Sequence, residues 1–241
     1  MAFRPRAAVG LKSGLALRGV TPPLRLADYR LVAFDMDSTL ISIECVDEIA
    51  AMAGRKAEVA AITEAAMRGE IADYKESLRR RVALLKGVTA SDLQRVYDER
   101  LRLNPGVERF VAACRAAGLH TLLVSGGFTF FSDRVRDRLQ IDETRSNVLE
   151  FEDGALTGRM VDQAWGDICD GEEKRRAVLQ SCARLGIDPA RTIAVGDGAN
   201  DLPMMRAVGL SIAFHAKPAV RAEANISIEE GGLDRALEVL V

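Results

Sequence analysis

The stretch "LVAFDMDSTL", from Leu31 to Leu40, joins a short apolar run to two aspartates, Asp35 and Asp37, that lie one residue apart. Three later runs have the same apolar character: "TLLV" (121–124), "TIAV" (192–195) and "LSIAF" (210–214). Short apolar runs separated by helical patterns are typical of buried parallel strands. The sequence therefore predicts an α/β fold in which these four runs belong to one parallel sheet.

Small or acidic residues follow the first three runs, as "DMDST", "SGGF" and "GDGAND". In open parallel sheets, ligands bind outside the carboxyl ends of the strands. We therefore expect these three segments to converge on one crevice. The residues expected there as neighbours are Asp35, Asp37, Ser125, Gly126, Asp197 and Asp201.

The overall composition argues against several classes of protein. The 241 residues include 33 Lys plus Arg and 35 Asp plus Glu, and this near balance gives no indication of a nucleic-acid partner. No apolar run approaches the roughly 20 residues that a membrane-spanning helix needs, so we expect no membrane association. Four widely spaced cysteines without a CxxC pair indicate reduced thiols, which are typical of a cytoplasmic protein.

The domain organisation follows from the helical patterns. Residues 43–103 have helical periodicity almost throughout and are too long for a single strand-to-strand connection. We expect them to form an inserted helical cap above the crevice, where a lid excludes water and contacts the substrate. The α/β core then comprises residues 27–42 and 104–241. Within it, residues 148–161 alternate in polarity around Asp153-Gly154 and predict a small β-hairpin.

Residues 1–26 form a basic N-terminal extension, since the first acidic residue of the chain is Asp28. Several glycines and the pair Pro22-Pro23 weaken any continuous amphipathic helix in this stretch. We therefore predict a frayed basic extension. An organellar transit peptide, which has a similar composition, is the alternative.

The clustered aspartates indicate a metal site. A lone pair such as Asp35 and Asp37 most often caps a helix or tightens a turn. Here, however, Asp197 and Asp201 would bring two further carboxylates into the same crevice, and a cation is then needed to neutralise them. Oxygen-only ligands favour Mg²⁺.

The other polar residues of these segments suit a phosphate group. Hydroxyl donors are offered by Ser38, Thr39 and Ser125. The glycines at 126 and 127 let backbone N–H groups approach an anion, and Lys174 adds a positive charge. A carboxylate nucleophile, a magnesium ion and a phosphate cradle together predict phosphoryl transfer through an aspartyl-phosphate.

The segments "DMDST", "SGGF", Lys174 and "GDGAND" resemble, in this order, the four signature motifs of the haloacid dehalogenase (HAD) superfamily of phosphatases. Within that superfamily the chain is similar to the phosphoserine phosphatases from Leu31 onward, including "AMRGE", "SLRRRV" and "AFHAKP". This resemblance implies a Rossmann-like core with the helical cap. It also implies Mg²⁺-dependent hydrolysis of O-phospho-L-serine to L-serine and phosphate, the last step of serine biosynthesis.

The same resemblance implies a role for each site residue. Asp35 is the nucleophile, and Asp37 is the general acid that protonates the leaving group and later activates water. Mg²⁺ binds the side chains of Asp35 and Asp197 and the backbone carbonyl of Asp37, while Asp201 orients the waters of the metal. The implied substrate contacts are Ser125, Gly126 and Lys174 for the phosphate, Glu44 for the ammonium, Arg81 for the carboxylate, Asn200 for a further polar contact, and Met67 for the apolar wall of the cap.

One departure from the family pattern concerns the cap. Between Met67 and Ser77 the chain is one residue longer than the usual spacing, and one extra residue turns a helix by about 100°. The aromatic residue that closes the cap is therefore not fixed by the motif, and Tyr74 is the candidate. For Arg81, which follows two other arginines, a solvated helix face is the alternative.

Other functions stay open at this point. The chain would be a phosphotransferase if an alcohol rather than water accepted the phosphoryl group, and another small phosphorylated metabolite would also suit the motifs. A catalytically silent binding module can retain such a fold. We expect a small-molecule substrate and either a monomer or a homodimer.

Overall fold

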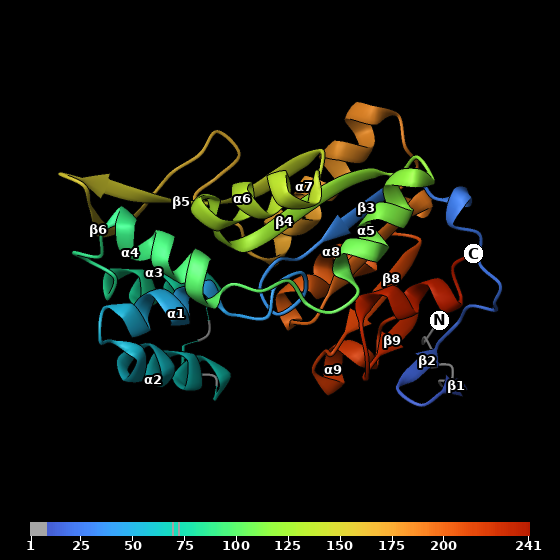
Figure 1. Ribbon diagram of the computed structural model, residues 1–241, viewed down its shortest axis with the longest axis horizontal. Coiled ribbons are helices and arrows are strands. Elements are labelled where there is room, and N and C mark those ends of the chain that lie inside the picture. Colours follow the sequence, from blue (N-terminus) through green and yellow to red (C-terminus); the bar gives the residue numbers. More distant parts are fainter. Residues whose placement is uncertain (1–8, 69, 72) are drawn as a thin grey trace.

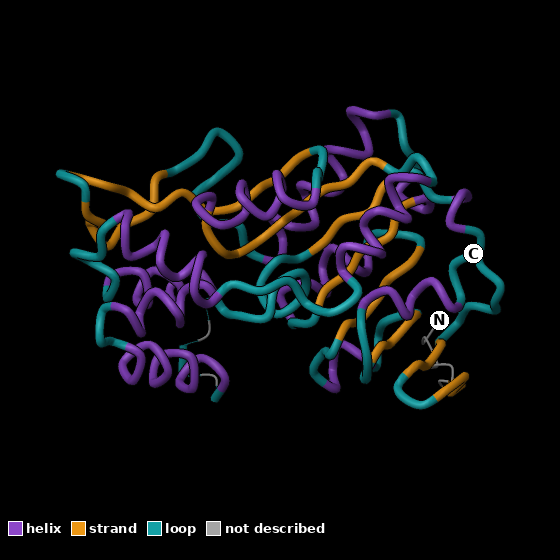
Figure 2. The backbone as a smooth tube through the Cα atoms, in the orientation of Figure 1, coloured by secondary structure: helices purple, strands orange, loops and turns teal. Residues whose placement is uncertain are grey.

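The computed structural model describes residues 9–68, 70–71 and 73–241. Within these residues, nine strands form one sheet in the order β1-β2-β9-β8-β7-β3-β4-β5-β6 (Figures 1 and 2). Its parallel part comprises β3 (Leu31–Phe34), β4 (His120–Phe128), β5 (Glu143–Glu152), β7 (Thr192–Gly196), β8 (Leu210–Phe214) and β9 (Ile226–Ile228). The predicted α/β fold with a parallel sheet is confirmed.

Strand β3 lies at the centre of the parallel part, between β4 and β7. Phe34, its last residue, pairs with Leu123 of β4 on one side and with Val195 of β7 on the other. The chain runs from β3 to β4 in one direction and later enters β7 on the opposite side of β3. Such a reversal opens a crevice at the carboxyl ends of the strands.

Helices cover both faces of this sheet. Strand β3 is therefore buried on both sides and consists of apolar residues. Val32 and Phe34 point into one core cluster together with residues of α5 (Val107–Ala116) and α6 (Thr129–Leu139). Leu31 and Ala33 point into a second cluster, which includes residues of α7 (Gly171–Leu185), α8 (Leu202–Arg206) and α9 (Pro218–Arg221). A strand buried on both faces has no polar side to expose.

A group of helices follows β3 before the chain returns to the sheet at α5. It consists of α1 (Cys45–Met52), α2 (Lys56–Met67), α3 (Tyr74–Ala83) and α4 (Ala90–Arg95), which continues as a π-helical turn over Val96–Arg100. Figure 1 shows these helices gathered beside the sheet rather than on either of its faces. The chain leaves and re-enters the core at one place, where Ser42 N–H donates to Arg102 O at 2.9 Å.

The predicted β-hairpin is confirmed. β5 pairs antiparallel with β6 (Ala155–Val161), and Asp153-Gly154 form the turn with positive φ angles of 50° and 81°. The hairpin reaches the helical group, because Gly87 N–H donates to Leu156 O and Leu156 N–H donates to Val88 O, both at 2.8 Å. The cap helices are therefore hydrogen-bonded to the core at a second place.

The N-terminal segment corrects one expectation. A frayed extension is wrong for residues 9–17, because β1 (Val9–Lys12) and β2 (Leu15–Leu17) continue the sheet antiparallel beyond β9. Leu15 and Leu17 are buried, and their alternation with Ala16 is the pattern of a strand with one face on the core. Residues 1–8 of the predicted extension lie outside the described residues.

The remaining regular elements are 3₁₀ turns at Leu26–Asp28, Pro189–Arg191, Ala199–Asp201 and Leu233–Glu238. Among the described residues, no helix combines the length and the apolar character that crossing a membrane requires.

Candidate active site

The floor of the site is a buried ion-pair cluster at the carboxyl end of β3. Asp35 follows β3 directly, and its N–H still donates to Val195 O of β7 at 2.9 Å. Lys174 extends from α7 with no exposed surface, and its Nζ donates to Asp35 Oδ1 at 2.5 Å and to Asp201 Oδ1 at 2.7 Å. Burial alone would lower the pKa of Lys174, but the charges of Asp201 and Asp35 outweigh it and raise that pKa. The lysine is therefore a permanent cation beneath Asp35.

The loop after Asp35 is held in a fixed shape by one amide side chain. Asn104 Nδ2 donates to the backbone carbonyls of Ser38, Thr39 and Ile41, at 3.2, 2.9 and 3.0 Å. Ser38 adopts a positive φ of 59°, an uncommon conformation for a residue with a side chain. This loop directs Asp37 toward the crevice, where its Oδ2 accepts the Cys45 N–H at 3.0 Å.

Asp37 differs from Asp35 in its partners, since it accepts a backbone N–H whereas Asp35 accepts a hydrogen bond from Lys174. Burial, with a further contribution from the charge of Glu44, raises the pKa of Asp37 to about 7. Its Oδ1 is buried and accepts no hydrogen bond from the described part of the chain. A carboxyl group with a pKa near 7 can donate a proton at neutral pH and take one back, as a general acid and base requires.

The last part of β4, where its pairing with β5 is irregular between Val124 and Phe128, provides a compact surface of small groups at Ser125–Gly127, called the glycine turn below. Ser125 is buried, and its Oγ accepts the Gly127 N–H at 2.9 Å. A Cβ on Gly126 would lie 2.3 Å from Tyr74 Oη, and a Cβ on Gly127 would lie 2.9 Å from Met36 Cε. Both distances are shorter than nonbonded contacts, so a side chain at either position would displace the end of Tyr74 or of Met36. Backbone N–H groups without neighbouring side chains can approach an anion closely.

The end of β7 contributes the other two aspartates. Asp201 Oδ2 accepts the N–H groups of Asp197 and Gly198, at 3.1 and 3.0 Å, and Thr39 Oγ1 donates to Asp197 Oδ1 at 3.2 Å. Burial, followed by the charges of Asp201 and Glu44, raises the pKa of Asp197 to about 7. Burial and Asp201 likewise raise the pKa of Asp35, although Lys174 opposes them. Together, the ionised carboxylates of this cluster carry more negative charge than the single positive charge of Lys174 can neutralise.

The geometry suits a metal ion. One carboxylate oxygen from each of Asp35, Asp197 and Asp201 lies within 4.8 Å of the others. Both oxygens of Asp201 are already engaged by hydrogen bonds, one with Lys174 and the other with two backbone N–H groups. Asp35 and Asp197 are therefore the acids with free capacity for a cation. An all-oxygen donor set of this kind fits Mg²⁺.

These residues surround a cavity of about 280 Å³ between the sheet and the cap. Most of the predicted site residues line it, namely Asp35, Asp37, Glu44, Arg81, Ser125, Gly126, Asp197 and Asn200. Lys174 and Asp201 lie below its floor, in contact with Asp35 and Asp197 as described. Met67 ends α2, and its side chain lies outside the described part of the structure. The predicted residues thus converge, while their individual roles remain predictions.

The cap closes the cavity with three polar side chains. Glu44 precedes α1, and its Oε1 accepts the Ser38 Oγ–H at 2.6 Å. Arg81 from α3 lines the cavity and makes one long hydrogen bond, from Nε to Ser77 O at 3.4 Å. Tyr74, the aromatic candidate, lies against Gly126, and burial raises the pKa of its hydroxyl to about 12. Tyr74 is therefore neutral and covers the glycine turn.

Three polar residues that line the cavity escaped the sequence analysis: Asp47, Thr63 and Lys217. Asp47 lies in the first turn of α1, three residues after the predicted site residue Glu44, and this closeness in sequence could have identified it. Lys217 follows the predicted strand "LSIAF", so the rule about strand ends applied to it as well. Thr63 lies in mid-helix on α2, and the sequence carries no signal for it.

Comparison with known proteins gives consistent results. The family model described as haloacid dehalogenase-like hydrolase matches residues 32–206, which is more than half of the chain. A phosphoserine phosphatase of Polaromonas sp. is 69% identical over 230 residues, covering 95% of this chain and 98% of the relative. A phosphoserine phosphatase of Albidiferax ferrireducens is 70% identical over 226 residues, covering 94% and 95%.

A solved structure is similar over the same range. It is described as a phospho-aspartyl intermediate analogue of phosphoserine phosphatase and superposes with a TM-score of 0.80 at 35% sequence identity. The match covers 88% of this chain and 99% of that structure. The likeness therefore includes the cap as well as the sheet.

Proposed function

The chain belongs to the haloacid dehalogenase-like hydrolase family, and from that premise we infer that it is a phosphoserine phosphatase. Relatives that carry this name are about 70% identical to it over nearly their whole length. The structural observation that carries the inference is the position of Asp35, which contacts Lys174 at the floor of the cavity and has Asp37 beside it. The reaction is the hydrolysis of O-phospho-L-serine to L-serine and phosphate.

The first step of the reaction transfers the phosphoryl group to Asp35. One carboxylate oxygen of Asp35 forms a bond to phosphorus while the bond between phosphorus and the serine oxygen breaks. The electron pair of the broken bond stays on that oxygen, which takes the proton of Asp37, so that neutral serine hydroxyl leaves. Lys174 occupies Asp35 Oδ1, which leaves Oδ2 for the attack.

The second step hydrolyses the aspartyl-phosphate. Asp37, now ionised, removes a proton from a water molecule, and the resulting hydroxide oxygen attacks phosphorus. The bond between phosphorus and Asp35 breaks, phosphate is released, and both aspartates regain their starting forms. The pKa of about 7 for Asp37 suits this alternation, since neither protonation state is strongly disfavoured at neutral pH.

We propose that Mg²⁺ is the cofactor. The side chains of Asp35 and Asp197 and the backbone carbonyl of Asp37 would hold it, with Asp201 fixing Asp197 through the two N–H groups that it binds. When bound, the ion supplies positive charge that keeps Asp35 ionised and neutralises the phosphoryl oxygens. The need for a cation is supported by the pKa values of Asp35 and Asp197, which are raised when no cation is present.

Substrate recognition divides between the two sides of the cavity. We propose that Ser125, Gly126 and Lys174 bind the phosphate, in agreement with the buried Ser125 hydroxyl and the lack of side chains at Gly126 and Gly127. On the cap side, Glu44 binds the ammonium group and Arg81 the carboxylate, since a guanidinium can hold a carboxylate by two hydrogen bonds. Asn200 adds a polar contact and Met67 an apolar wall.

We further propose a cytoplasmic enzyme that acts as a monomer or homodimer in the last step of serine biosynthesis. The four cysteines Cys45, Cys114, Cys169 and Cys182 are free and buried, which supports a reducing compartment. Another small phosphorylated metabolite as the substrate, or an alcohol as the phosphoryl acceptor, remains the alternative activity.

A substrate panel tests the function directly. The purified chain is assayed with phosphoserine, phosphothreonine, phosphoethanolamine and 3-phosphoglycerate, each with Mg²⁺ and with excess EDTA. We expect phosphoserine to have the highest kcat/KM and EDTA to abolish turnover until Mg²⁺ is restored. A higher kcat/KM for a compound without an ammonium group would contradict the proposal. Product analysis with added ethanol or glycerol separates hydrolysis from phosphotransfer.

A further inference from the structure

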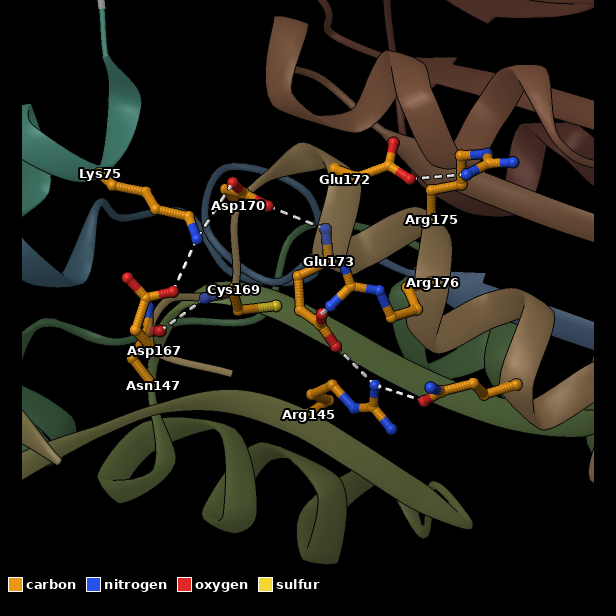
Figure 3. A network of polar contacts seen from close by, with 11 residues as sticks. Lys75, Arg145, Asn147, Asp167, Cys169, Asp170, Glu172, Glu173, Arg175 and Arg176 are labelled. Atoms are coloured by element: carbon orange, nitrogen blue, oxygen red, sulfur yellow. Dashed lines mark hydrogen bonds and ion pairs between the residues drawn. The ribbon is translucent and has the colours of Figure 1, made fainter. Parts of the chain in front are cut away.

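A network of ion pairs joins the cap to the core segment that precedes α7 (Figure 3). Lys75 Nζ, from the first turn of α3, lies 2.6 Å from Asp167 Oδ1 and 3.7 Å from Asp170 Oδ2. Arg79, one turn further along α3, places its Nη2 2.5 Å from Asp167 Oδ2. By contrast, Arg80 pairs with Glu76 inside α3. Lys75 and Arg79 thus tie the cap to segment 167–170, whereas Arg80 does not.

Segment 167–170 leads directly into the helix that carries Lys174. Asp170 is the N-cap residue of α7, and its Oδ1 accepts the Glu173 N–H at 2.8 Å. A cap residue of this kind fixes where its helix begins. Lys174 lies in the first turn of α7. Asp170, which Lys75 approaches, therefore also sets the position of the Lys174 ammonium group beneath Asp35.

The same segment is hydrogen-bonded to the glycine turn in the last part of β4. Asn147 is buried in β5, where its Oδ1 accepts the Cys169 N–H and its Nδ2 donates to Gly126 O, both at 2.8 Å. Figure 3 shows Asn147 and Cys169 side by side below Asp170. Segment 167–170 is therefore anchored on its inner side to the turn that binds the phosphate.

Through Tyr74, the ion pairs of α3 affect the space inside the cavity. It precedes Lys75 in α3, and its Oη lies so near Gly126 that a Cβ there would be 2.3 Å away. The start of α3 therefore contacts this region of the core twice, once through the ion pair of Lys75 and once through the side chain of Tyr74. With Lys75 bound to Asp167, Tyr74 covers the glycine turn and limits the space above the phosphate site.

We propose that Lys75 is a positioning residue that holds the first turn of α3 against segment 167–170, and thereby keeps Tyr74 over Gly126. This inference rests on the proposed phosphatase function and adds a basis for selectivity. The closed position favours a small leaving group such as serine. A bulky leaving group requires the helix end to move outward, so the same ion pair disfavours it.

The test compares Lys75→Met with Arg80→Met in the full chain with Mg²⁺. Both variants remove one cation from α3, but only Lys75 reaches the core. We expect Lys75→Met to raise KM for phosphoserine about three- to tenfold with kcat within about twofold, since partly exposed ion pairs contribute modestly. For p-nitrophenyl phosphate we expect kcat/KM to stay constant or to increase. Arg80→Met should match the wild type on both substrates.

A conservative variant and salt sharpen the test. Lys75→Arg keeps the charge and should restore most of the wild-type KM for phosphoserine. Added NaCl screens such pairs, so it should narrow the difference in KM between the wild type and Lys75→Met. Equal losses on both substrates in Lys75→Met, or a similar loss in Arg80→Met, would overturn the proposal because they would indicate a general effect on α3.

A failure of the positioning role of Lys75 can be distinguished from a failure of the proposed phosphatase function. Wild-type turnover of phosphoserine is measured first, and its absence would contradict the proposed function. Wild-type turnover together with an unchanged KM in Lys75→Met would contradict only the positioning role of Lys75.

Discussion

The two sides of the cavity are built differently. On the core side, Asp35, Ser125, Lys174 and Asp201 are buried and held by short hydrogen bonds to each other or to the backbone of neighbouring strands. On the cap side, Arg81 makes one hydrogen bond at 3.4 Å, and the ion pairs of α3 with the core are partly exposed to solvent. The polar groups of the core side are thus held more tightly than those of the cap side.

This difference follows from what each side must do. Bond formation to phosphorus demands that the nucleophile and the proton donor be fixed to within fractions of an ångström. Substrate entry and product release demand that the cap open, which strong burial of its polar groups would prevent. Substitutions on the core side should therefore reduce the chemical step for every substrate. Substitutions on the cap side should change the preference among substrates.

The largest effect is expected from Asp35→Asn on the core side. An amide cannot attack phosphorus as a carboxylate does, so kcat for phosphoserine should fall by about 10⁴-fold or more. The fold should persist, because asparagine has nearly the same shape and Lys174 retains Asp201 as a partner. Steady-state phosphate release with Mg²⁺ measures the loss, and thermal melting followed by circular dichroism checks the fold.

The exposed carboxylate of Asp137 on α6 provides a matched control, since Asp137→Asn makes the same chemical change away from the cavity. Residual activity of more than a small percentage in Asp35→Asn would show that the reaction does not pass through an aspartyl-phosphate.

A smaller but more specific effect is expected from Asp37→Asn. Serine leaves as a poor alkoxide unless it is protonated, whereas nitrophenolate leaves without a proton. The first phosphoryl transfer from phosphoserine should therefore slow by about 10² to 10⁴, and the transfer from p-nitrophenyl phosphate far less. Single-turnover release of serine is compared with the burst of nitrophenol.

Turnover with the phenyl substrate is expected to stall after that burst, because the second step also needs Asp37 to activate water. If the first transfers from both substrates slowed equally, Asp37 would support metal binding or the fold and would not protonate the leaving group. The core side would then contain one catalytic carboxylate rather than two with opposite protonation states.

The core side was the more predictable one from sequence. Several of its residues lie at the carboxyl ends of buried apolar strands, and burial on both faces makes such strands visible as unbroken apolar runs. Asp35, Ser125 and Asp197 could therefore be expected at one crevice from their positions after these runs. β1 and β2 were missed because β2 contributes only the three residues "LAL" within a glycine-rich stretch.

The cap side was predictable only in outline. Helical periodicity reveals the insertion but not how each helix is rotated about its axis, and the extra residue before Ser77 left Tyr74 as a mere candidate. The ion pairs of Lys75 and the hydrogen bonds of Asn147 join residues far apart in sequence, 92 positions for Lys75 and Asp167. Such contacts depend on the packing of complete elements, and the sequence gives no local signal for them.

Arg81→Ala tests whether the cap side determines substrate preference. A charged hydrogen-bonding group contributes about 1.5–3 kcal/mol, so KM for phosphoserine should rise about 10- to 100-fold. Phosphoethanolamine has no carboxylate, and its KM should change less than about threefold. Arg80→Ala, one position away on the exposed side of α3, is the control. Parallel losses on both substrates would mean that Arg81 supports the cap or the phosphate instead of the carboxylate.

The smallest effect is expected where the two sides meet, at Gly126 and Tyr74. A Cβ at position 126 would lie 2.3 Å from Tyr74 Oη but 3.5 Å from Tyr74 Cζ, which is an ordinary contact. Because the obstructing atom is the end of a side chain, Gly126→Ala should displace Tyr74 rather than the glycine turn. We expect KM for phosphoserine to rise about five- to tenfold, the range of a mild overpacking cost. Steady-state kinetics of the single and double variants measure it.

Tyr74→Phe removes only the hydroxyl that obstructs, so the double variant Gly126→Ala/Tyr74→Phe should recover most of the wild-type KM. Gly127→Ala is the matched control, since its Cβ would meet Met36 Cε at 2.9 Å and Ser125 Oγ at 3.1 Å on the core side. Tyr74→Phe should not relieve that variant. If the effects of Gly126→Ala and Tyr74→Phe simply multiplied, Tyr74 would not press on the glycine turn. The cap would then close without touching the phosphate site, and the two sides of the cavity would be independent.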